Sequence, residues 1–79
     1  MIKRVEYDRK ANAVYIYFSD KTVARTKKLD DMRYIDYDSE DAIVGVELLH
    51  VNDAVMTDNL PNRAEIERAL CSRGIRAYA

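Results

Sequence analysis

Apolar and polar residues alternate along much of the first 51 positions of the chain, which is the pattern of β-strands that bury one face. The clearest run is 14–18, where every residue is β-branched or aromatic. Because successive side chains of a strand point to opposite faces, the three apolar members are expected on one face and Tyr15 and Tyr17 on the other. The same alternation predicts four further strands, at 2–8, 22–29, 32–38 and 43–51. The strand at 22–29 is the most polar, which is typical of a sheet edge.

Two of the expected hairpins resemble each other. Residues 5–8 recur as 35–38, 30 positions later, with an apolar, an acidic, a tyrosine and an aspartate residue in the same order. The same offset aligns Val14 with Val44, Ile16 with Val46, and Phe18 with Leu48. Each copy is expected to form a strand, a polar turn and a second strand. The sequence therefore predicts one sheet of two similar hairpins, with consecutive strands paired antiparallel.

The pattern changes after residue 51. Residues 53–60 show no regular period, and a helix is expected over 62–73. Asn62 is a candidate N-cap, Glu65 would complete a capping box, and Gly74 is suited to the C′ position. The prediction is an α+β fold: a five-stranded antiparallel sheet of two similar hairpins, followed by one C-terminal helix. Residues 1–51 form the sheet core, and 52–79 form the linker, helix and tail of the same single domain.

Composition narrows the functional classes. A chain of 79 residues forms one domain with a thin core, and self-association as a homodimer would help to stabilise it. The single cysteine, Cys71, rules out an internal disulfide and suits a reducing cytoplasm. Charged residues make up 34% of the chain but the net charge is −1, so no strong global attraction to nucleic acid is expected. No segment has the length and apolarity of a membrane span.

Several short motifs, in this order and spacing, resemble a known family. They are Val5-Glu6-Tyr7-Asp8, Ala13-Val14-Tyr15-Ile16, Val23-x-x-Thr26, Ile35-Asp36-Tyr37-Asp38 and Ile43-Val44-Gly45-Val46-Glu47-Leu48-Leu49. Together they are similar to the small bacterial domain-of-unknown-function family 2283, over residues 3–50. The family commonly has a glycine in the acidic turn, where this chain has Ser39-Glu40-Asp41. The resemblance implies no established activity and no functional residue. Some members of the family resemble partners of small toxin-like proteins, which implies an antitoxin-type binding role.

Acidic residues near the second hairpin are the first candidates for chemistry. Asp36, Asp38 and Glu47, with Glu40 at the fifth position, superficially match the spacing of a calcium loop, but the position that needs glycine is Asp41 and the flanks alternate like strands. The same three carboxylates could serve a metal-dependent hydrolase if the fold brought them together. The plainer interpretation is a solvated acidic turn, and the sequence predicts no metal and no cofactor.

The other candidates are a possible catalytic pair and a possible binding surface. His50 and Cys71 could act together only if the fold makes them neighbours, and otherwise His50 ends a strand while Cys71 is a small helical residue. Tyr15 and Tyr17 could stack on bases or pack in a protein interface. The arginines that could contact phosphate or an acidic partner are Arg63, Arg68 and Arg73.

Because no complete catalytic set is present, the prediction is a non-enzymatic protein-interaction module, with itself or a small protein as partner. A nucleic-acid-binding module and a small metal-dependent hydrolase remain the alternatives.

Overall fold

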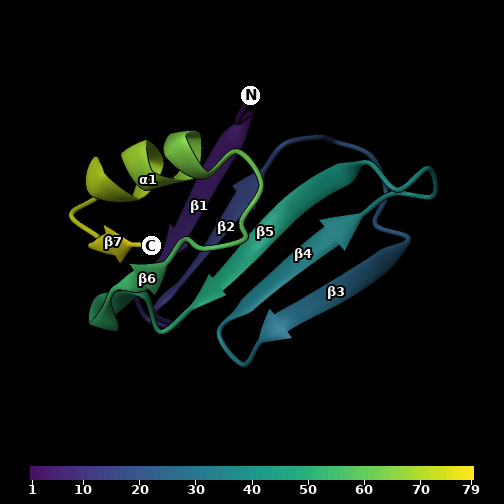
Figure 1. The fold of residues 1–79 in the computed structure, drawn as a ribbon. Helices are drawn as coiled ribbons and strands as arrows, with labels where there is room; N and C mark the ends of the chain where they lie inside the picture. The colour runs from purple at the N-terminus through teal and green to yellow at the C-terminus, as the bar shows by residue number, and fades with distance from the viewer.

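The computed structural model describes all residues, 1–79, and consists of a five-stranded antiparallel sheet with a helix and a two-stranded sheet against one of its faces (Figure 1). The strands of the large sheet are β1 (Arg4–Asp8), β2 (Ala13–Tyr17), β3 (Arg25–Asp30), β4 (Arg33–Tyr37) and β5 (Ile43–Leu49). Their spatial order is β1-β2-β5-β4-β3, with every pair antiparallel. The helix α1 spans Arg63–Cys71. The predicted fold class is confirmed.

The two hairpins, β1-β2 and β4-β5, lie side by side and have equivalent registers. Val5 pairs with Ile16 in the first hairpin, and Ile35 pairs with Val46 in the second, which is the same pair shifted by the repeat. Between the hairpins, Ile16 pairs with Val46, so the repeat maps this pair onto itself. The hairpins are therefore related by an approximate two-fold axis that passes through the sheet at Ile16 and Val46.

The expectation that consecutive strands pair is wrong at β3. The chain leaves β2 at Tyr17 and crosses to the opposite edge of the sheet, where β3 pairs with β4. This strand begins at Arg25 rather than at residue 22, so Val23 lies outside it and is 43% exposed. The reason is burial, because β2 and β5 are the most apolar strands, and their pairing places β5 at the centre of the sheet with β2 beside it. The polar strand is left at the edge, as expected.

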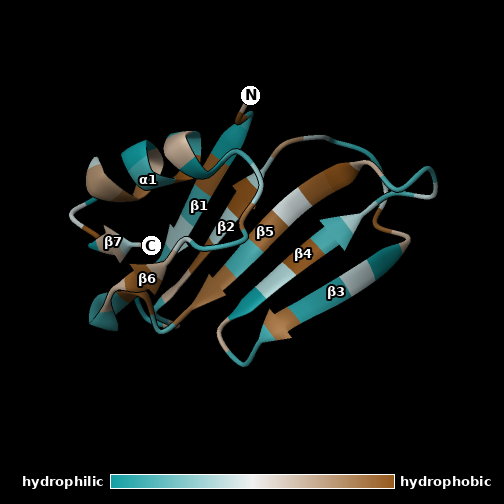
Figure 2. Cartoon of the chain, in the orientation of Figure 1, coloured by the Kyte–Doolittle hydropathy of each residue, from teal (hydrophilic) through white to brown (hydrophobic).

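The core lies between the sheet and α1, where the apolar positions of the strands and the helix meet (Figure 2). Ile66 and Leu70 of α1 are fully buried. They form one cluster with the inward residues of the sheet, among them Val14, Ile16, Ile35, Val46 and Leu48. A helix with one apolar stripe thus covers the apolar side of an alternating sheet, as the sequence pattern predicts.

The two ends of α1 compare differently with expectation. At its C-terminus Gly74 has φ +76°, and the amide of Ile75 donates to the carbonyl of Leu70 at 3.0 Å, which is a Schellman motif. The expected capping box is wrong. Asn62 has φ 49° rather than the extended conformation of an N-cap, and its side chain caps nothing. Glu65 instead accepts a hydrogen bond from the amide of Ile2 at 3.3 Å.

The linker and the tail are more ordered than the sequence indicates. Strand β5 ends at Leu49, and a 3-10 helix, η1 (Val51–Asp53), follows it. The short strands β6 (Val55–Met56) and β7 (Ala77–Tyr78) pair in parallel and join the linker to the tail. The amide of Thr57 donates to the carbonyl of Tyr78 at 2.7 Å. Nothing helical here has the length or apolarity needed to cross a bilayer.

Candidate functional site

The sheet face that points away from α1 carries a short row of Asp8, Ala13 and Leu49 at one end. Beside it lie two rows that cross all five strands, which we call the tyrosine face. Its first row, read across the five strands, is Arg4, Tyr17, Gly45, Asp36 and Thr26. Its second row is Glu6, Tyr15, Glu47, Tyr34 and Lys28. Tyr15 and Tyr17 thus lie opposite the apolar side of β2, as predicted. The helix and the small sheet pack on the other side, so neither element covers these rows (Figure 1).

Tyr15 is fixed in place across the centre of this face. Its ring lies directly over Gly45, since a Cβ built at position 45 would be 2.3 Å from Tyr15 Cε1. Its hydroxyl donates to Asp36 Oδ2 at 2.5 Å, and the Thr26 hydroxyl donates to Asp36 Oδ1 at 2.5 Å. Burial of the hydroxyl, and then the adjacent Asp36 carboxylate, raise the pKa of Tyr15. The central strand β5 is therefore covered on this side by a single ring rather than by a second layer.

Tyr17 continues the same surface toward the β1 edge. Its ring centroid is 4.5 Å from that of Tyr15, with the planes tilted by 49°. The Arg4 guanidinium lies 4.0 Å above the Tyr17 ring, which is a cation–π contact. The Tyr17 hydroxyl donates to Glu6 Oε1 at 3.1 Å. The side chains of this face thus support one another and are pre-organised before any partner binds.

The distribution of charge over the tyrosine face follows the strands. The edge strands β1 and β3 contribute Arg4, Glu6 and Lys28, whereas the tyrosines lie on the inner strands. Asp36 and Glu47 are the two charged residues near the centre, and Asp36 already accepts two hydroxyl hydrogen bonds. The inner strands thus carry tyrosines together with two carboxylates, and an aromatic-rich patch with a polar rim is found in many protein interfaces.

The three carboxylates considered as metal ligands have separate roles. Asp38 is only 4% exposed, and its Oδ1 accepts the amides of Glu40 at 2.8 Å and Ala42 at 3.0 Å. These two backbone donors hold the pKa of Asp38 below its usual value. The residue therefore shapes the turn between β4 and β5, while Asp36 and Glu47 lie on the tyrosine face. No group of three or more His, Cys, Asp or Glu side chains in the structure could hold a metal ion.

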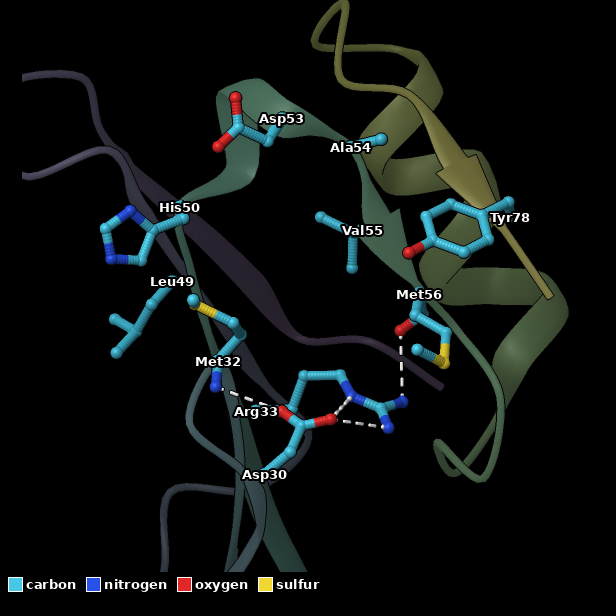
Figure 3. A pocket seen from close by; sticks show the side chains of 10 residues that line it. All are labelled: Asp30, Met32, Arg33, Leu49, His50, Asp53, Ala54, Val55, Met56 and Tyr78. Carbon is cyan, nitrogen blue, oxygen red and sulfur yellow. Dashed lines mark hydrogen bonds and ion pairs between the residues drawn. The ribbon is translucent and has the colours of Figure 1, made fainter.

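His50 and Cys71 do not line the same hollow. His50 follows β5 in a left-handed conformation, with φ 53°, and lines a cavity of about 190 Å³ (Figure 3). Cys71 is exposed near the end of α1 and lines a different hollow beside Gly74 and Ile75. The structure therefore gives the proposed thiol and imidazole no common site.

The cavity beside His50 is built around a buried arginine that sequence reasoning missed. Arg33 is 7% exposed, and its Nε and Nη2 both donate to Asp30 Oδ2 at 2.9 Å. Its Nη1 donates to the carbonyl of Met56 at 3.1 Å (Figure 3) and also to the carbonyl of Asp58. Because these donors are engaged within the chain, Arg33 ties the sheet to β6 and offers little to a ligand. The signal was its inward position in β4, two residues before Ile35, where an apolar residue is expected.

The arginines of the C-terminal part are distant in the fold from the tyrosines. Arg63 Nε contacts Glu67 Oε2 at 3.1 Å, and Arg73 Nη1 donates to the carbonyl of Ala69 at 2.8 Å. Arg68 is exposed on α1. Since α1 packs on the apolar side of the sheet, these arginines and the tyrosine face lie on opposite sides of it. The two residue groups of the nucleic-acid hypothesis therefore do not share one surface.

Comparison with known proteins identifies a family for the chain. No curated protein and no solved structure shows significant similarity to the chain. A family model described as "Protein of unknown function (DUF2283)" matches residues 4–52. This segment holds all five strands of the large sheet and both rows of the tyrosine face, whereas α1 lies outside it. The match covers more than half of the chain, which therefore belongs to this family of proteins of unknown function.

Proposed function

We propose that the chain is a small, non-enzymatic protein-interaction module that binds another protein chain through its tyrosine face. One observation carries the proposal: three tyrosines occupy the inner strands of an open sheet face, with charged residues on its two edge strands. Tyrosine is enriched in protein interfaces because it supplies a large contact area with few rotatable bonds. An antitoxin-type role, in which the bound chain is a small toxin-like protein, is one form of this function.

The pre-organisation of the surface supports the proposal further. The hydrogen bond from Tyr15 to Asp36 and the stacking of Tyr17 under Arg4 fix these side chains in the free chain. These side chains would therefore lose less conformational entropy when a partner binds than mobile side chains would. The whole face lies in the segment that defines the family, so the sheet rather than the helix is the element to test first.

Nucleic-acid binding fits this surface less well. The tyrosine face carries Glu6, Asp36 and Glu47 against two basic residues, and a phosphate backbone would be repelled by the excess of carboxylates. Base stacking on Tyr15 would also have to displace a ring that is held over Gly45. Retention of DNA or RNA by the chain at low salt, lost on adding salt, would favour this alternative instead.

The test uses two variants that differ in the face they alter. Tyr34→Lys places a charge at an inner position of the tyrosine face, and Lys27→Glu changes a charge on the opposite side of β3. Tagged wild-type and variant chains are used as bait in a lysate of the source organism, and each is first shown to be folded by circular dichroism. We expect the wild type and Lys27→Glu to capture the same protein and Tyr34→Lys to lose it. Equal capture by all three would contradict the proposal.

A further inference from the structure

We infer that the tyrosine face binds a second copy of this chain, in a two-fold dimer whose axis runs across the strands between the two rows. The inference rests on the proposed function, because it names the partner of the same surface. It follows from how the residues of one row compare with those of the other. When two identical faces pack about such an axis, the first row of one copy faces the second row of the other.

The two rows bring opposite charges together at the β1 edge, where Arg4 and Glu6 also lie 3.6 Å apart within one chain, and bring no like charges together at the other strands. At the β1 edge, Arg4 of one copy faces Glu6 of the second copy. On β2 the two tyrosines face each other, and on β4 the Asp36 carboxylate faces the hydroxyl-bearing side chain of Tyr34. On β5, Glu47 of one copy faces position 45 of the other, which the Tyr15 ring covers, and on β3 Thr26 faces Lys28. Each contact occurs twice in the dimer, and none of them brings like charges together.

The position of Glu47 argues against the other simple two-fold arrangement. An axis that runs along β5 would place Glu47 of one copy on Glu47 of the other, at the centre of the interface. Two unpaired carboxylates in contact are destabilising. An axis across the strands avoids that contact and aligns the two sheets, as in a β-sandwich, with the twist of each sheet setting the angle between them.

The size of the face limits the strength of this dimer. Five strands spaced by about 4.8 Å and five residues of about 3.4 Å each give a flat area of about 400 Å² per copy. Stable interfaces bury about 800 Å² per partner. The flat area is smaller than this, so the uneven surface of the protruding side chains must supply part of the contact area. The dimer is therefore expected to be weak and to depend on concentration. The net charge of −1 per chain gives little repulsion against it.

A second surface on the opposite side of the sheet serves as the control. A shallow hollow beside the start of α1 is lined by the apolar side chains of Leu29, Ile35, Tyr37, Ile43, Leu60 and Pro61. Lys27 also lines this hollow, whereas its neighbour Lys28 belongs to the tyrosine face. A variant at Lys27 therefore tests for self-association through this hollow rather than through the tyrosine face.

The experiment is a charge swap at the β1 edge, followed by sedimentation equilibrium over a hundredfold range of concentration. Arg4→Glu would place two glutamates opposite each other across the axis, and Glu6→Arg would place two arginines there. We expect the wild type to approach twice the mass of one chain, and each single reversal to lower the association constant about tenfold, since the contact occurs twice. The double variant, Arg4→Glu with Glu6→Arg, should recover the wild-type constant, and Lys27→Glu should not change it.

The outcomes separate the two proposals. A monomer at every concentration, or a dimer that ignores both reversals, would overturn the inference. A dimer weakened by Lys27→Glu alone would move the contact to the apolar hollow and would overturn it as well. If the wild type is monomeric while Tyr34→Lys still abolishes capture from a lysate, the second copy is the wrong partner but the interaction function stands.

Discussion

The two faces of the large sheet are made from the same strands but are closed in different ways. On the apolar side, branched aliphatic residues meet α1, and Ile16, Val46 and Leu70 have no exposed surface. On the tyrosine face the side chains close over their own sheet, where Tyr15 lies across Gly45 and its hydroxyl reaches Asp36. The apolar side is shielded from solvent by another element of the fold, whereas the tyrosine face is shielded by the side chains of its own strands.

Because of this difference, the two faces contribute differently to the stability of the chain. The apolar side supplies the stability, because the burial of aliphatic side chains is the dominant favourable term in folding. The tyrosine face is held by single hydrogen bonds and ring contacts, each of which contributes little in a partly solvated place. A surface that is ordered but lightly stabilised can be changed without unfolding the chain. It is therefore the face on which binding can be tested by substitution.

The largest expected effect is on the apolar side. Leu70→Ala removes a fully buried side chain from the centre of the cluster and leaves a cavity between α1 and the sheet. We expect the free energy of unfolding to fall by about 3 kcal/mol, which is a large share of the stability of so small a domain. Urea denaturation followed by circular dichroism measures it. Tyr34→Ala on the other face is the control, and an equal loss there would show that the two faces do not differ as described.

An intermediate effect is expected where the tyrosine face is most tightly packed. Gly45→Ala would bring a methyl group within 2.3 Å of the Tyr15 ring, so the ring must leave its place. We expect a loss of about 2 kcal/mol, which is typical of overpacking. In a Tyr15→Val background the same substitution should cost less than about 0.5 kcal/mol, because nothing then lies over position 45. Equal losses in both backgrounds would place the cause in the β5 backbone rather than in the ring.

The fold could be predicted from the sequence wherever a pattern is local. The alternation at β2, the helical stripe of α1 and the glycine after it each depend on a few neighbouring residues, and all three are confirmed. The path from β2 to β3 could not be derived, because pairing with β2 is decided by competition between strands far apart in sequence. The apolar β5 wins that competition over the polar β3. The capping box failed because Asn62 adopts a left-handed conformation that the residue type permits but does not require.

For the same reason, only part of the candidate site could be predicted from the sequence. The sequence places Tyr15 and Tyr17 on the side of β2 away from the core, and the structure agrees. It does not show that the Tyr15 hydroxyl contacts Asp36, since that contact joins a residue of β2 to a residue of β4 across the intervening strand β5. Asp36 and Asp38 look alike in the sequence, yet one holds a tyrosine and the other holds a turn. Carboxylate spacing alone therefore could not distinguish a binding face from a turn.

The smallest expected effect concerns the single hydrogen bond that fixes Tyr15. Tyr15→Phe keeps the ring over Gly45 but removes the donor to Asp36, which then retains only the Thr26 hydroxyl. We expect a loss of about 1 kcal/mol near neutral pH, the usual value for one hydrogen bond. Tyr17→Phe is the matched control, because its hydroxyl donates to an exposed glutamate at 3.1 Å and should contribute less.

The pH dependence of the same variant tests the physical reason. Burial and the Asp36 carboxylate raise the pKa of Tyr15 in the folded chain, whereas an unfolded tyrosine ionises near pH 10. The contribution of Tyr15 is therefore complete below about pH 10 and is lost as the pH rises through the folded-state pKa. The difference in stability between the wild type and Tyr15→Phe should therefore shrink above about pH 10. A difference that stays constant into alkali would mean that Asp36 does not hold the neutral hydroxyl, and the tyrosine face would then owe its order to ring packing alone.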